Sequence, residues 1–405
     1  MKIGVYGGTF DPPHLGHMNA ARAAAVLLGL DQLLFIPAAA PPHKILPHDT
    51  APEEDRLAMT ALVADGICTE EKRPGLAVID SIELERGGRS FTAETLSKLR
   101  ERWPKEELWL LMGADMLLTF QKWRDPEKIA ALARIAAFDR TGDGNGTMKQ
   151  QAEHLQEEYG AEITLLTLPQ IVNISSTRLR ELLREDRDKA RDLLWCQVYG
   201  YIIRKGLYGV SADLWHLSDD DLRCASLSMV KAKRIAHIRG CEAEAVRLAE
   251  RWGADPHFAR RAGILHDCTK YLDLGEQLKL CKKYGIVLDD LERTAVKLLH
   301  AKTGAAIARE VYGEPAEVCE AIFWHTTGKA NMSTLDKVLY LADYIEPSRA
   351  DFPGLAELRK LAYEDLNAAL LMGCEMTIRE MEEHGACVHV NTSQARDYLK
   401  GRDNG

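Results

Sequence analysis

The sequence predicts two domains: an N-terminal α/β domain with a parallel sheet over residues 1–209, and an all-helical C-terminal domain over residues 210–405. The first observation is the length of 405 residues, which exceeds that of most single domains. The second is that short apolar runs alternate with helical segments in the first half. The third is that nearly every segment from Ser211 onward has helical composition.

The overall composition restricts the class of protein. Hydrophobic residues make up 46% of the chain, which is enough for ordinary globular cores. A net charge of −9 and an isoelectric point near 5.9 argue against non-specific nucleic-acid binding. No apolar run of about eighteen residues and no signal-peptide pattern is found, so we expect a cytoplasmic protein without a membrane partner. The nine cysteines are scattered without a C-x-x-C pair and are expected to stay reduced.

The N-terminal stretch is the most informative part of the chain. Residues 3–6 form an apolar run that has the length of a buried strand, and Gly7 and Gly8 end this run. Two prolines come next, and a helix-forming segment follows them. Such a turn presents backbone N–H groups and the positive end of a helix to an anion, most often a phosphate. We therefore expect a phosphate-binding turn that includes Thr9 and Phe10.

Two histidines stand at the start of the helix that follows. His14 and His17 are three positions apart, so both rings can face one ligand. Paired imidazoles can stabilise the charge that develops during phosphoryl or nucleotidyl transfer. Solvated loop histidines are the alternative, and the preceding strand and double glycine favour a functional pair. The chain here resembles the nucleotidyltransferases with an H-x-G-H signature, and most closely the bacterial nicotinate-nucleotide adenylyltransferases, because it reads G-G-T-F-D-P-P-H-L-G-H.

The other elements of the first half are expected from apolar runs for strands and from helix-forming composition for helices. Strands are expected at residues 33–37, 78–84, 108–112 and 163–168, and helices at residues 53–63 and 147–159. The resemblance adds a short helix and a strand within residues 129–138. It also implies that the sheet is Rossmann-like.

The resemblance implies roles for several residues between the strands. After the second expected strand the chain reads P-P-H-K, and Lys44 matches a phosphate-binding lysine of the family. Thr92, a reasonable helix N-cap, matches a position beside the mononucleotide. Trp123 matches a tryptophan that stacks on the pyridine ring, although a tryptophan is more often a core residue. Gly113 and Asp115 match the G-x-D turn of the family.

A second motif reads I-S-S-T-R-L-R. Ser175, Ser176 and Thr177 place three hydroxyls at an expected helix start, where they can cap the helix and donate to phosphate. A capped amphipathic helix is the common explanation of such a run, but the nucleotidyltransferases keep I-S-S-T-x-[IL]-R after a strand at this place. By this match Arg180 is a phosphate ligand, since an arginine can clamp phosphate through paired hydrogen bonds.

The resemblance implies attack by the phosphate of nicotinate mononucleotide on the α-phosphorus of ATP, which gives the dinucleotide and pyrophosphate. Positioning and charge stabilisation by His14, His17, Lys44, Arg180 and Mg²⁺ would carry the reaction. The sequence shows no carboxylate cage for magnesium, which fits an ion held by the triphosphate and water. Nicotinamide mononucleotide and phosphopantetheine remain alternative acceptors, although the tryptophan and the threonine named above favour a pyridine nucleotide.

The helical half places histidines and aspartates inside apolar runs. A single histidine in such a run is more often a core residue with a hydrogen-bond partner, but several are hard to explain in that way. Buried charges and imidazoles need partners, and one shared metal centre would satisfy all of them. Mixed nitrogen and oxygen ligands suit Fe, Mn, Co, Zn or Mg. The candidate ligands are His237, His266, Asp267, His300, His325 and Asp343.

The ordered set H…HD…H…H…D resembles the HD-domain metal phosphohydrolases. The stretches I-F-W-H-T-T-G and L-Y-L-A-D-Y-I-E-P-S-R are similar to the bacterial YqeK-type HD proteins, which hydrolyse diadenosine tetraphosphate symmetrically to two ADP. The resemblance implies two iron ions, with Asp267 as bridging ligand and catalytic residue, but the residue types alone do not choose iron over manganese, cobalt or zinc. The first ion would take His237, His266, Asp267 and Asp343, and the second His300 and His325.

Two cations are expected to bind phosphate beside this centre. Lys270 and Arg349 match phosphate-binding positions of the HD family, and solvated surface charges are the alternative. Two departures from the families concern fine specificity: Phe91 stands where many adenylyltransferases have tyrosine, and Asp397 stands where asparagine is common.

The sequence therefore predicts a bifunctional enzyme whose partners are ATP, nicotinate mononucleotide and diadenosine tetraphosphate. For the second half, a phosphohydrolase of another nucleotide and a regulatory nucleotide-binding module remain alternatives. Whether the chain forms homo-oligomers stays open.

Overall fold

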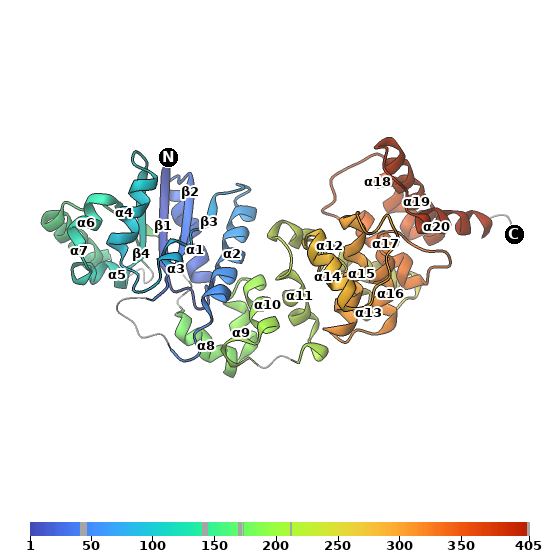
Figure 1. The fold of residues 1–405 in the computed structure, drawn as a ribbon, viewed down its shortest axis with the longest axis horizontal. Coiled ribbons are helices and arrows are strands. Elements are labelled where there is room, and N and C mark those ends of the chain that lie inside the picture. Colours follow the sequence, from blue (N-terminus) through green and yellow to red (C-terminus); the bar gives the residue numbers. More distant parts are fainter. Residues whose placement is uncertain (41–46, 140–144, 169–171, 173, 211–212, 403–405) are drawn as a thin grey trace. The chain divides into compact units, whose positions relative to one another are not determined.

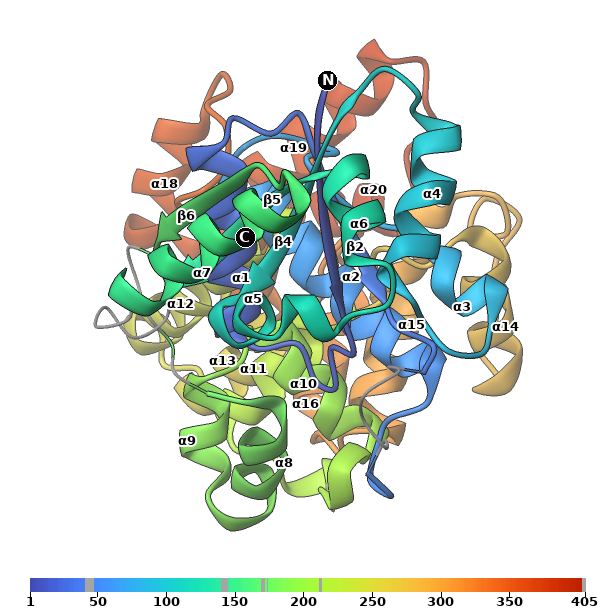
Figure 2. The ribbon, with the colours of Figure 1, turned by 90° about the vertical axis from the view of Figure 1, so that its left-hand side faces the viewer.

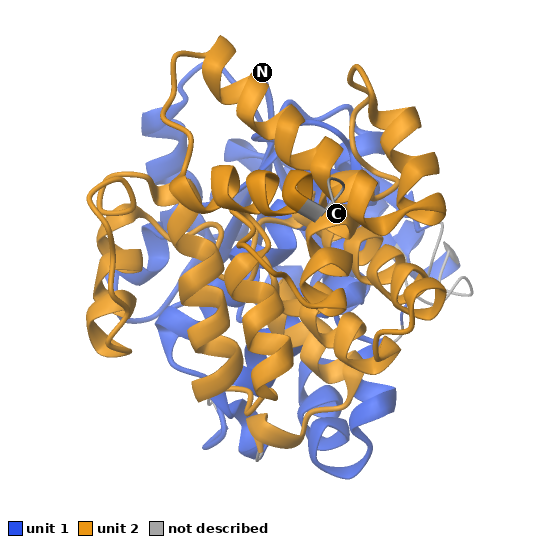
Figure 3. Cartoon of the chain, turned by 90° about the vertical axis from the view of Figure 1, so that its right-hand side faces the viewer, with its two compact units in different colours: residues 1–211 blue, residues 212–405 orange. Residues whose placement is uncertain are grey.

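The computed structural model describes residues 1–40, 47–139, 145–168, 172, 174–210 and 213–402. The chain divides into two compact units, Met1–Ser211 and Ala212–Gly405 (Figure 1; Figure 3). The first contains a six-stranded parallel sheet with helices, and the second is helical. The predicted fold class is therefore confirmed. None of the described helices is both long and apolar enough to cross a membrane.

The sheet of the first unit has the strand order β3-β2-β1-β4-β5-β6, with every pair parallel. The strand order reverses between β1 and β4, and ligands of open parallel sheets bind outside the carboxyl ends of the strands at such a point. The strands are β1 (Lys2–Gly8), β2 (Gln32–Pro37), β3 (Ala77–Ile79), β4 (Glu107–Gly113), β5 (Arg134–Asp139) and β6 (Ile163–Thr167).

Ten α-helices are described in this unit, and Figure 2 shows α8 and α9 side by side. They are α1 (Leu15–Leu27), α2 (Glu53–Glu70), α3 (Ile82–Arg86), α4 (Thr92–Arg102), α5 (Ala114–Leu118), α6 (Pro126–Leu132), α7 (Asn145–Tyr159), α8 (Ser176–Glu185), α9 (Arg187–Asp192) and α10 (Cys196–Lys205). Alternate residues of the central strands, such as Ile3 and Val5, enter one core with Leu96 of α4 and Ile129 of α6. This core holds the carboxyl ends of β1 and β4 in place.

Three boundaries in this unit differ from the sequence prediction. The strand expected at residues 78–84 ends at Ile79, because the Asp80 carboxylate accepts a hydrogen bond from the Ile82 amide (3.0 Å) and the chain turns into α3. Helix α2 continues to Glu70, well beyond the expected end. Thr92 is the first residue of α4 and not its N-cap, which is Phe91.

Ten α-helices are described in the second unit, with α12 in contact with both α13 and α17, and α15 against α16. Aspartate or serine caps begin several of them; the Asp255, Asp273, Ser333 and Asp365 side chains accept hydrogen bonds from the first-turn amides. The helices are α11 (Asp219–Leu227), α12 (Ile235–Trp252), α13 (Pro256–Leu265), α14 (Leu274–Lys283), α15 (Val296–Glu310), α16 (Ala316–Trp324), α17 (Thr334–Ile345), α18 (Leu355–Glu364), α19 (Leu366–Glu383) and α20 (Val390–Arg402).

Candidate functional sites

The glycine turn after β1 forms one wall of a cavity of about 250 Å³. The opposite wall comes from the start of α8, so the fold brings the two N-terminal sequence motifs together. The Ser176 hydroxyl donates a hydrogen bond to the Pro12 carbonyl oxygen (3.0 Å), which joins the two motifs directly. The expected site residues that line this cavity are Gly7, Gly8, Thr9, Phe10, His14, His17, Gly113, Asp115, Ser175, Ser176, Thr177 and Arg180.

The two histidine rings lie against each other at the start of α1, with their planes tilted by 31°. Their ring centroids are 3.7 Å apart, and the Nδ1 atom of His17 accepts a hydrogen bond from the His14 amide (3.3 Å). His14 is 2% exposed, and Phe10 packs edge-on against the His17 ring. Both rings line the cavity, and these contacts hold them in place.

Arg180 makes internal contacts that the sequence does not suggest. Its Nη1 atom donates to the Asp11 carbonyl oxygen (2.7 Å), and its Nε atom donates to the Asp49 carboxylate (3.2 Å). The Tyr208 hydroxyl donates to the other side of Asp11, at 2.8 Å from Oδ1. Asp11, which sequence reasoning missed, therefore fastens the glycine turn to α8 and to the end of the unit, and Arg180 borders the cavity while it holds this turn.

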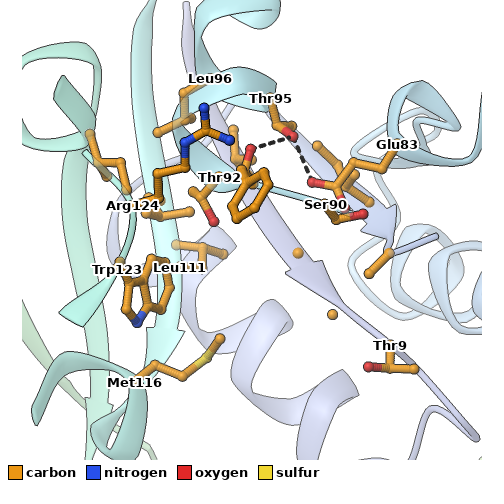
Figure 4. A pocket seen from close by; sticks show the side chains of 18 residues that line it. Thr9, Glu83, Ser90, Thr92, Thr95, Leu96, Leu111, Met116, Trp123 and Arg124 are labelled. Atoms are coloured by element: carbon orange, nitrogen blue, oxygen red, sulfur yellow. Dashed lines mark hydrogen bonds between the residues drawn. The ribbon is translucent and has the colours of Figure 1, made fainter. Parts of the chain in front are cut away.

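A second cavity, of about 270 Å³ (Figure 4), adjoins the first. Both are lined by the Gly7–Gly8–Thr9 turn and Met116, so they share a wall. Thr92 and Trp123, which are expected to contact the mononucleotide, line the second cavity, and Figure 4 shows the Trp123 indole facing into it. Much of the remaining wall is apolar and comes from Val5, Ile36, Leu96, Leu110, Leu111 and Ile129. This cavity suits a flat ring.

A buried carboxyl group in the second cavity was not anticipated. Glu83 is 6% exposed, and the Thr95 hydroxyl donates a hydrogen bond to it (2.7 Å). Burial raises the pKa of Glu83 above its ordinary value of 4.5. Glutamates are common on helices, so only its contacts identify Glu83 as part of the cavity. Lys44, the remaining expected residue of this unit, lies outside the described residues.

All six expected metal ligands of the second unit meet at one place. Five of them form two groups, His237 with His266 and Asp267, and Asp267 with His300 and His325, whose ligand atoms lie within 4.8 Å of one another in each group. Asp267 therefore belongs to both groups. Its Oδ2 atom is 3.7 Å from His237 Nε2, and its Oδ1 atom is 3.2 Å from His300 Nε2.

Asp343 completes the first group. Its Oδ1 atom is 3.1 Å from Nε2 of His237 and 3.9 Å from Nε2 of His266. Within each histidine pair the two Nε2 atoms are 3.2 Å apart. This spacing is compatible with two nitrogens that each lie about 2.1 Å from a shared ion.

The Nδ1 atoms of the histidines point away from this centre to fixed acceptors. Nδ1 of His266, His300 and His325 each donates at 2.7 Å to a backbone carbonyl oxygen three residues earlier in the chain. Nδ1 of His237 donates to the Glu346 carboxylate at 2.9 Å. Each neutral ring then presents the lone pair of Nε2 to the centre, and such outer hydrogen bonds are typical of metal-binding histidines. The donor set therefore fits divalent metal ions.

Burial and neighbouring charges favour the protonation states that bind metal. Burial lowers the pKa of His266 to about 4, and burial with the neighbouring His300 lowers that of His325 well below its usual value. Burial alone would raise the pKa of Asp267, but His266, His300 and Lys270 hold it well below the usual range. The same opposition, with a hydrogen bond from His237 and the charge of Arg349 against burial, lowers the pKa of Asp343. Neutral imidazoles and ionised carboxylates are the forms that coordinate metals.

The adjacent histidine and aspartate of the HD pair lie just beyond a helix. Helix α13 ends at Leu265, His266 is its C-cap, and Asp267 follows in a turn. The expected phosphate-binding cations lie beside the ligands: Lys270 Nζ is 3.3 Å from Asp267, and Arg349 Nη2 is 2.7 Å from Asp343.

Two further residues contact the ligands and were not predicted. Arg234, just before α12, donates to Asp267 Oδ2 from Nε (2.6 Å), and Glu346 orients His237. Asp289, Glu292 and His389 form another group of possible ligand residues. In this group the Glu292 carboxylate already forms an ion pair with the Lys302 ammonium. That ammonium supplies the positive charge that a metal would otherwise bring.

Comparison with known proteins gives a separate match for each unit. The cytidylyltransferase-like family matches residues 5–182, and the HD domain family matches residues 234–348. A probable nicotinate-nucleotide adenylyltransferase of Gemmatimonas aurantiaca is 36% identical over 209 residues, which are 51% of this chain and 92% of that protein. One of Thermus thermophilus is 37% identical over 208 residues, 51% of this chain and 100% of that protein.

A solved structure matches the other half of the chain. It is described as a "predicted HD superfamily hydrolase involved in NAD metabolism" from Clostridium acetobutylicum and is 42% identical. The match covers 46% of this chain and 98% of that chain, with a TM-score of 0.45.

Proposed function

The N-terminal half of this chain belongs to the nicotinate-nucleotide adenylyltransferase family, and from this premise we propose that it transfers AMP from ATP to nicotinate mononucleotide. The products would be nicotinate adenine dinucleotide and pyrophosphate. The observation that supports this proposal is the pair of adjoining cavities, because a transfer between two nucleotides needs two sites with a common wall.

ATP would occupy the cavity of the glycine turn, with its phosphates on the backbone amides after β1 and on the hydroxyls of Ser175–Thr177. The pyridine ring of the acceptor would lie in the apolar cavity against Trp123 and Thr92. The acceptor phosphate then reaches the shared wall and is itself the nucleophile, so no side chain needs to form a covalent bond.

Charge that develops on the α-phosphate would be stabilised by His14 and His17, whose rings are already fixed toward the cavity. Lys44 is proposed to contribute a further positive charge. A magnesium ion would arrive with ATP, held by the triphosphate and by water, and would neutralise phosphate charge when bound.

The test is an incubation of the full chain with ATP, Mg²⁺ and nicotinate mononucleotide, with the dinucleotide and pyrophosphate measured by chromatography. Nicotinamide mononucleotide and phosphopantetheine are run in parallel at equal concentrations. We expect the nicotinate acceptor to give the highest kcat/KM. Faster turnover of either alternative would overturn the acceptor assignment. If no pyrophosphate is released with any of the three acceptors, the transferase assignment itself is wrong.

We further propose that the HD unit is a phosphohydrolase that cleaves diadenosine tetraphosphate into two ADP. The observation that supports it is the placement of one carboxylate, Asp267, between two histidine pairs whose Nε2 atoms all face the same centre. His237, His266, Asp267 and Asp343 would hold one divalent ion, and His300, His325 and Asp267 a second. When bound, such ions supply an acidified water and neutralise phosphate charge.

The cations beside the ligands would orient the substrate. Lys270 and Arg349 would bind phosphoryl oxygens, while Arg234 keeps the Asp267 carboxylate in position. Iron is our first choice of metal on resemblance, with manganese, cobalt and zinc as alternatives. A regulatory module that binds nucleotides without cleavage is the competing proposal.

The second test combines the full chain with diadenosine tetraphosphate and Fe²⁺ or Mn²⁺, with metal content determined on the same sample. Two ADP and no other product is the expected result. AMP and ATP would keep the hydrolase but overturn the symmetrical cleavage. Absence of turnover with two metals bound would favour the regulatory module or another phosphate ester.

A further inference from the structure

We propose that a cavity between α17, the segment after it and α19 binds the nucleoside end of a nucleoside polyphosphate whose phosphate lies at the metal cluster. This inference rests on the proposed phosphohydrolase function and adds a base-binding site to it. The cavity has a volume of about 610 Å³. That is within the range of roughly 300–1,000 Å³ that is typical of small-molecule sites.

Arg349 connects this cavity to the metal cluster. Its side chain lines the cavity, and its Nη2 atom is 2.7 Å from the Oδ1 atom of Asp343, one of the expected ligands. Its Nε and Nη2 atoms also donate to the Asp343 carbonyl oxygen at 2.9 Å and 2.7 Å, which fixes the guanidinium. A ligand with one phosphate at the cluster would therefore pass Arg349 before its next group enters the cavity.

The inner wall offers aromatic and sulfur contacts for a base. Tyr344 and Phe352 lie edge to face, with ring centroids 5.9 Å apart and planes at 72°, and both line the cavity. The Thr377 hydroxyl, on α19, donates to the Tyr344 hydroxyl at 3.3 Å and fixes that ring from the opposite side. Met376 adds a polarisable thioether to the same wall. Held aromatic faces of this kind stack on nucleobases without selecting one base strongly.

The rim of the cavity carries charges of both signs. Arg379, Glu380 and Glu383 line it from the exposed side of α19. A rim with two carboxylates disfavours a second polyphosphate there, whereas carboxylates readily accept hydrogen bonds from ribose hydroxyls and exocyclic amines. The chemistry therefore changes from phosphate binding at Arg349 to nucleoside binding farther from the cluster.

The test uses the full metal-loaded chain and two variants of the cavity wall. Phe352→Ala removes one aromatic face, and Met376→Trp fills the cavity without removing a ring. Two constants are measured in one assay: the KM for diadenosine tetraphosphate, and the inhibition constant of inorganic pyrophosphate, which carries no nucleoside. We expect each variant to raise the KM about tenfold and to leave the inhibition constant of pyrophosphate unchanged.

Tyr284→Ala is the matched control, because Tyr284 is a half-buried aromatic residue at the end of α14 and does not line the cavity. It should alter neither constant. Metal content and the melting temperature of each variant establish that it is folded and loaded.

The outcomes separate this inference from the function on which it rests. If both constants rise by the same factor, or if neither changes, the cavity is not a nucleoside site and the inference is wrong while the hydrolase stands. If the unmodified, metal-loaded chain fails to cleave diadenosine tetraphosphate, the proposed function fails first and the inference falls with it.

Discussion

The candidate sites of the two units consist of different chemical groups. In the first unit, the site consists of cavities around a glycine turn and helix starts, and the nearby charged residues such as Arg180 already have partners. In the second unit, the site is a cluster of buried imidazoles and carboxylates that face one another. The first kind of site is ready in the folded chain, whereas the second kind requires a cation. We therefore expect graded responses to mutation in the first unit and all-or-none responses in the second.

The largest expected effect is that of Asp267→Asn. Because Asp267 faces both histidine pairs, this change should lower diadenosine tetraphosphate hydrolysis by roughly a thousandfold or more and reduce the bound metal. Adenylyl transfer should be unaffected. Metal analysis and both activity assays on the same sample measure this. Asp289→Asn, in the separate group that holds a lysine, is the control and should change neither activity. Loss of both activities in a folded variant would show that the units are not independent.

The reciprocal change is His17→Ala, with a smaller expected effect. Adenylyl transfer should fall about a hundredfold to a thousandfold in kcat, as is typical when one group that stabilises developing charge is removed. Hydrolysis should stay the same, because His17 lies in the other unit. His154→Ala removes an exposed histidine of the same unit and serves as the control. A drop smaller than about fivefold would contradict the proposed role of His17.

Trp123→Ala should act on acceptor binding and little else. The indole faces the apolar cavity, so we expect the KM for nicotinate mononucleotide to rise about tenfold, while the KM for ATP remains similar. Trp123→Phe keeps an aromatic face and should recover most of the loss. Steady-state kinetics with each substrate varied in turn provides the measurement. An equal rise in both KM values would mean that Trp123 supports the fold of the cavities and does not contact the ring.

The smallest expected effect is that of Glu83→Gln, which should change how the free energy of unfolding depends on pH. Burial raises the pKa of Glu83 in the folded chain, so ionisation of this group opposes folding. The native chain should therefore lose stability relative to the variant as the pH rises from about 4.5 through the raised pKa, with no such difference in more acidic solution. Asp267 and Asp343 have lowered pKa values, so their contribution has the opposite sign. The test is urea unfolding of both chains at several pH values, which gives the free energy of unfolding of the first unit. A difference in this free energy between the native chain and the variant that does not vary with pH would contradict the prediction.

Sequence patterns predicted those parts of the molecule that depend on local order. The strand, glycine turn and helix at the N-terminus, the helix start at Ser176 and the clustered histidines and aspartates all lie in runs that can be read without knowledge of the fold. The prediction of a strand over residues 78–84 was wrong beyond Ile79. Alternating polarity does not show where a carboxylate, here that of Asp80, accepts a hydrogen bond from a backbone amide and a helix begins.

Residues that act through distant partners could not be found in this way. Asp11 is hydrogen-bonded to Arg180 and Tyr208, which are 169 and 197 positions away in the sequence. No hydrophobic periodicity around Asp11 indicates these contacts. Arg234 and Glu346 likewise resemble ordinary surface charges until the fold brings them to Asp267 and His237. Only the tertiary structure identifies such residues.

The outer hydrogen bonds of the four histidines have a consequence for how the proposed metal centre tolerates sequence change. His266, His300 and His325 take their ring orientation from a carbonyl oxygen in their own helical turn, and any amino acid supplies that oxygen. The hydrogen bond that fixes the tautomer therefore does not depend on the side chain of the acceptor residue, although Gly263 is restricted by packing, since a Cβ there would lie 2.7 Å from Glu242 Cα. His237 depends on the side chain of Glu346, so its orientation can be lost by a single substitution. One quarter of the imidazole set is thus encoded by side-chain identity and three quarters by backbone geometry.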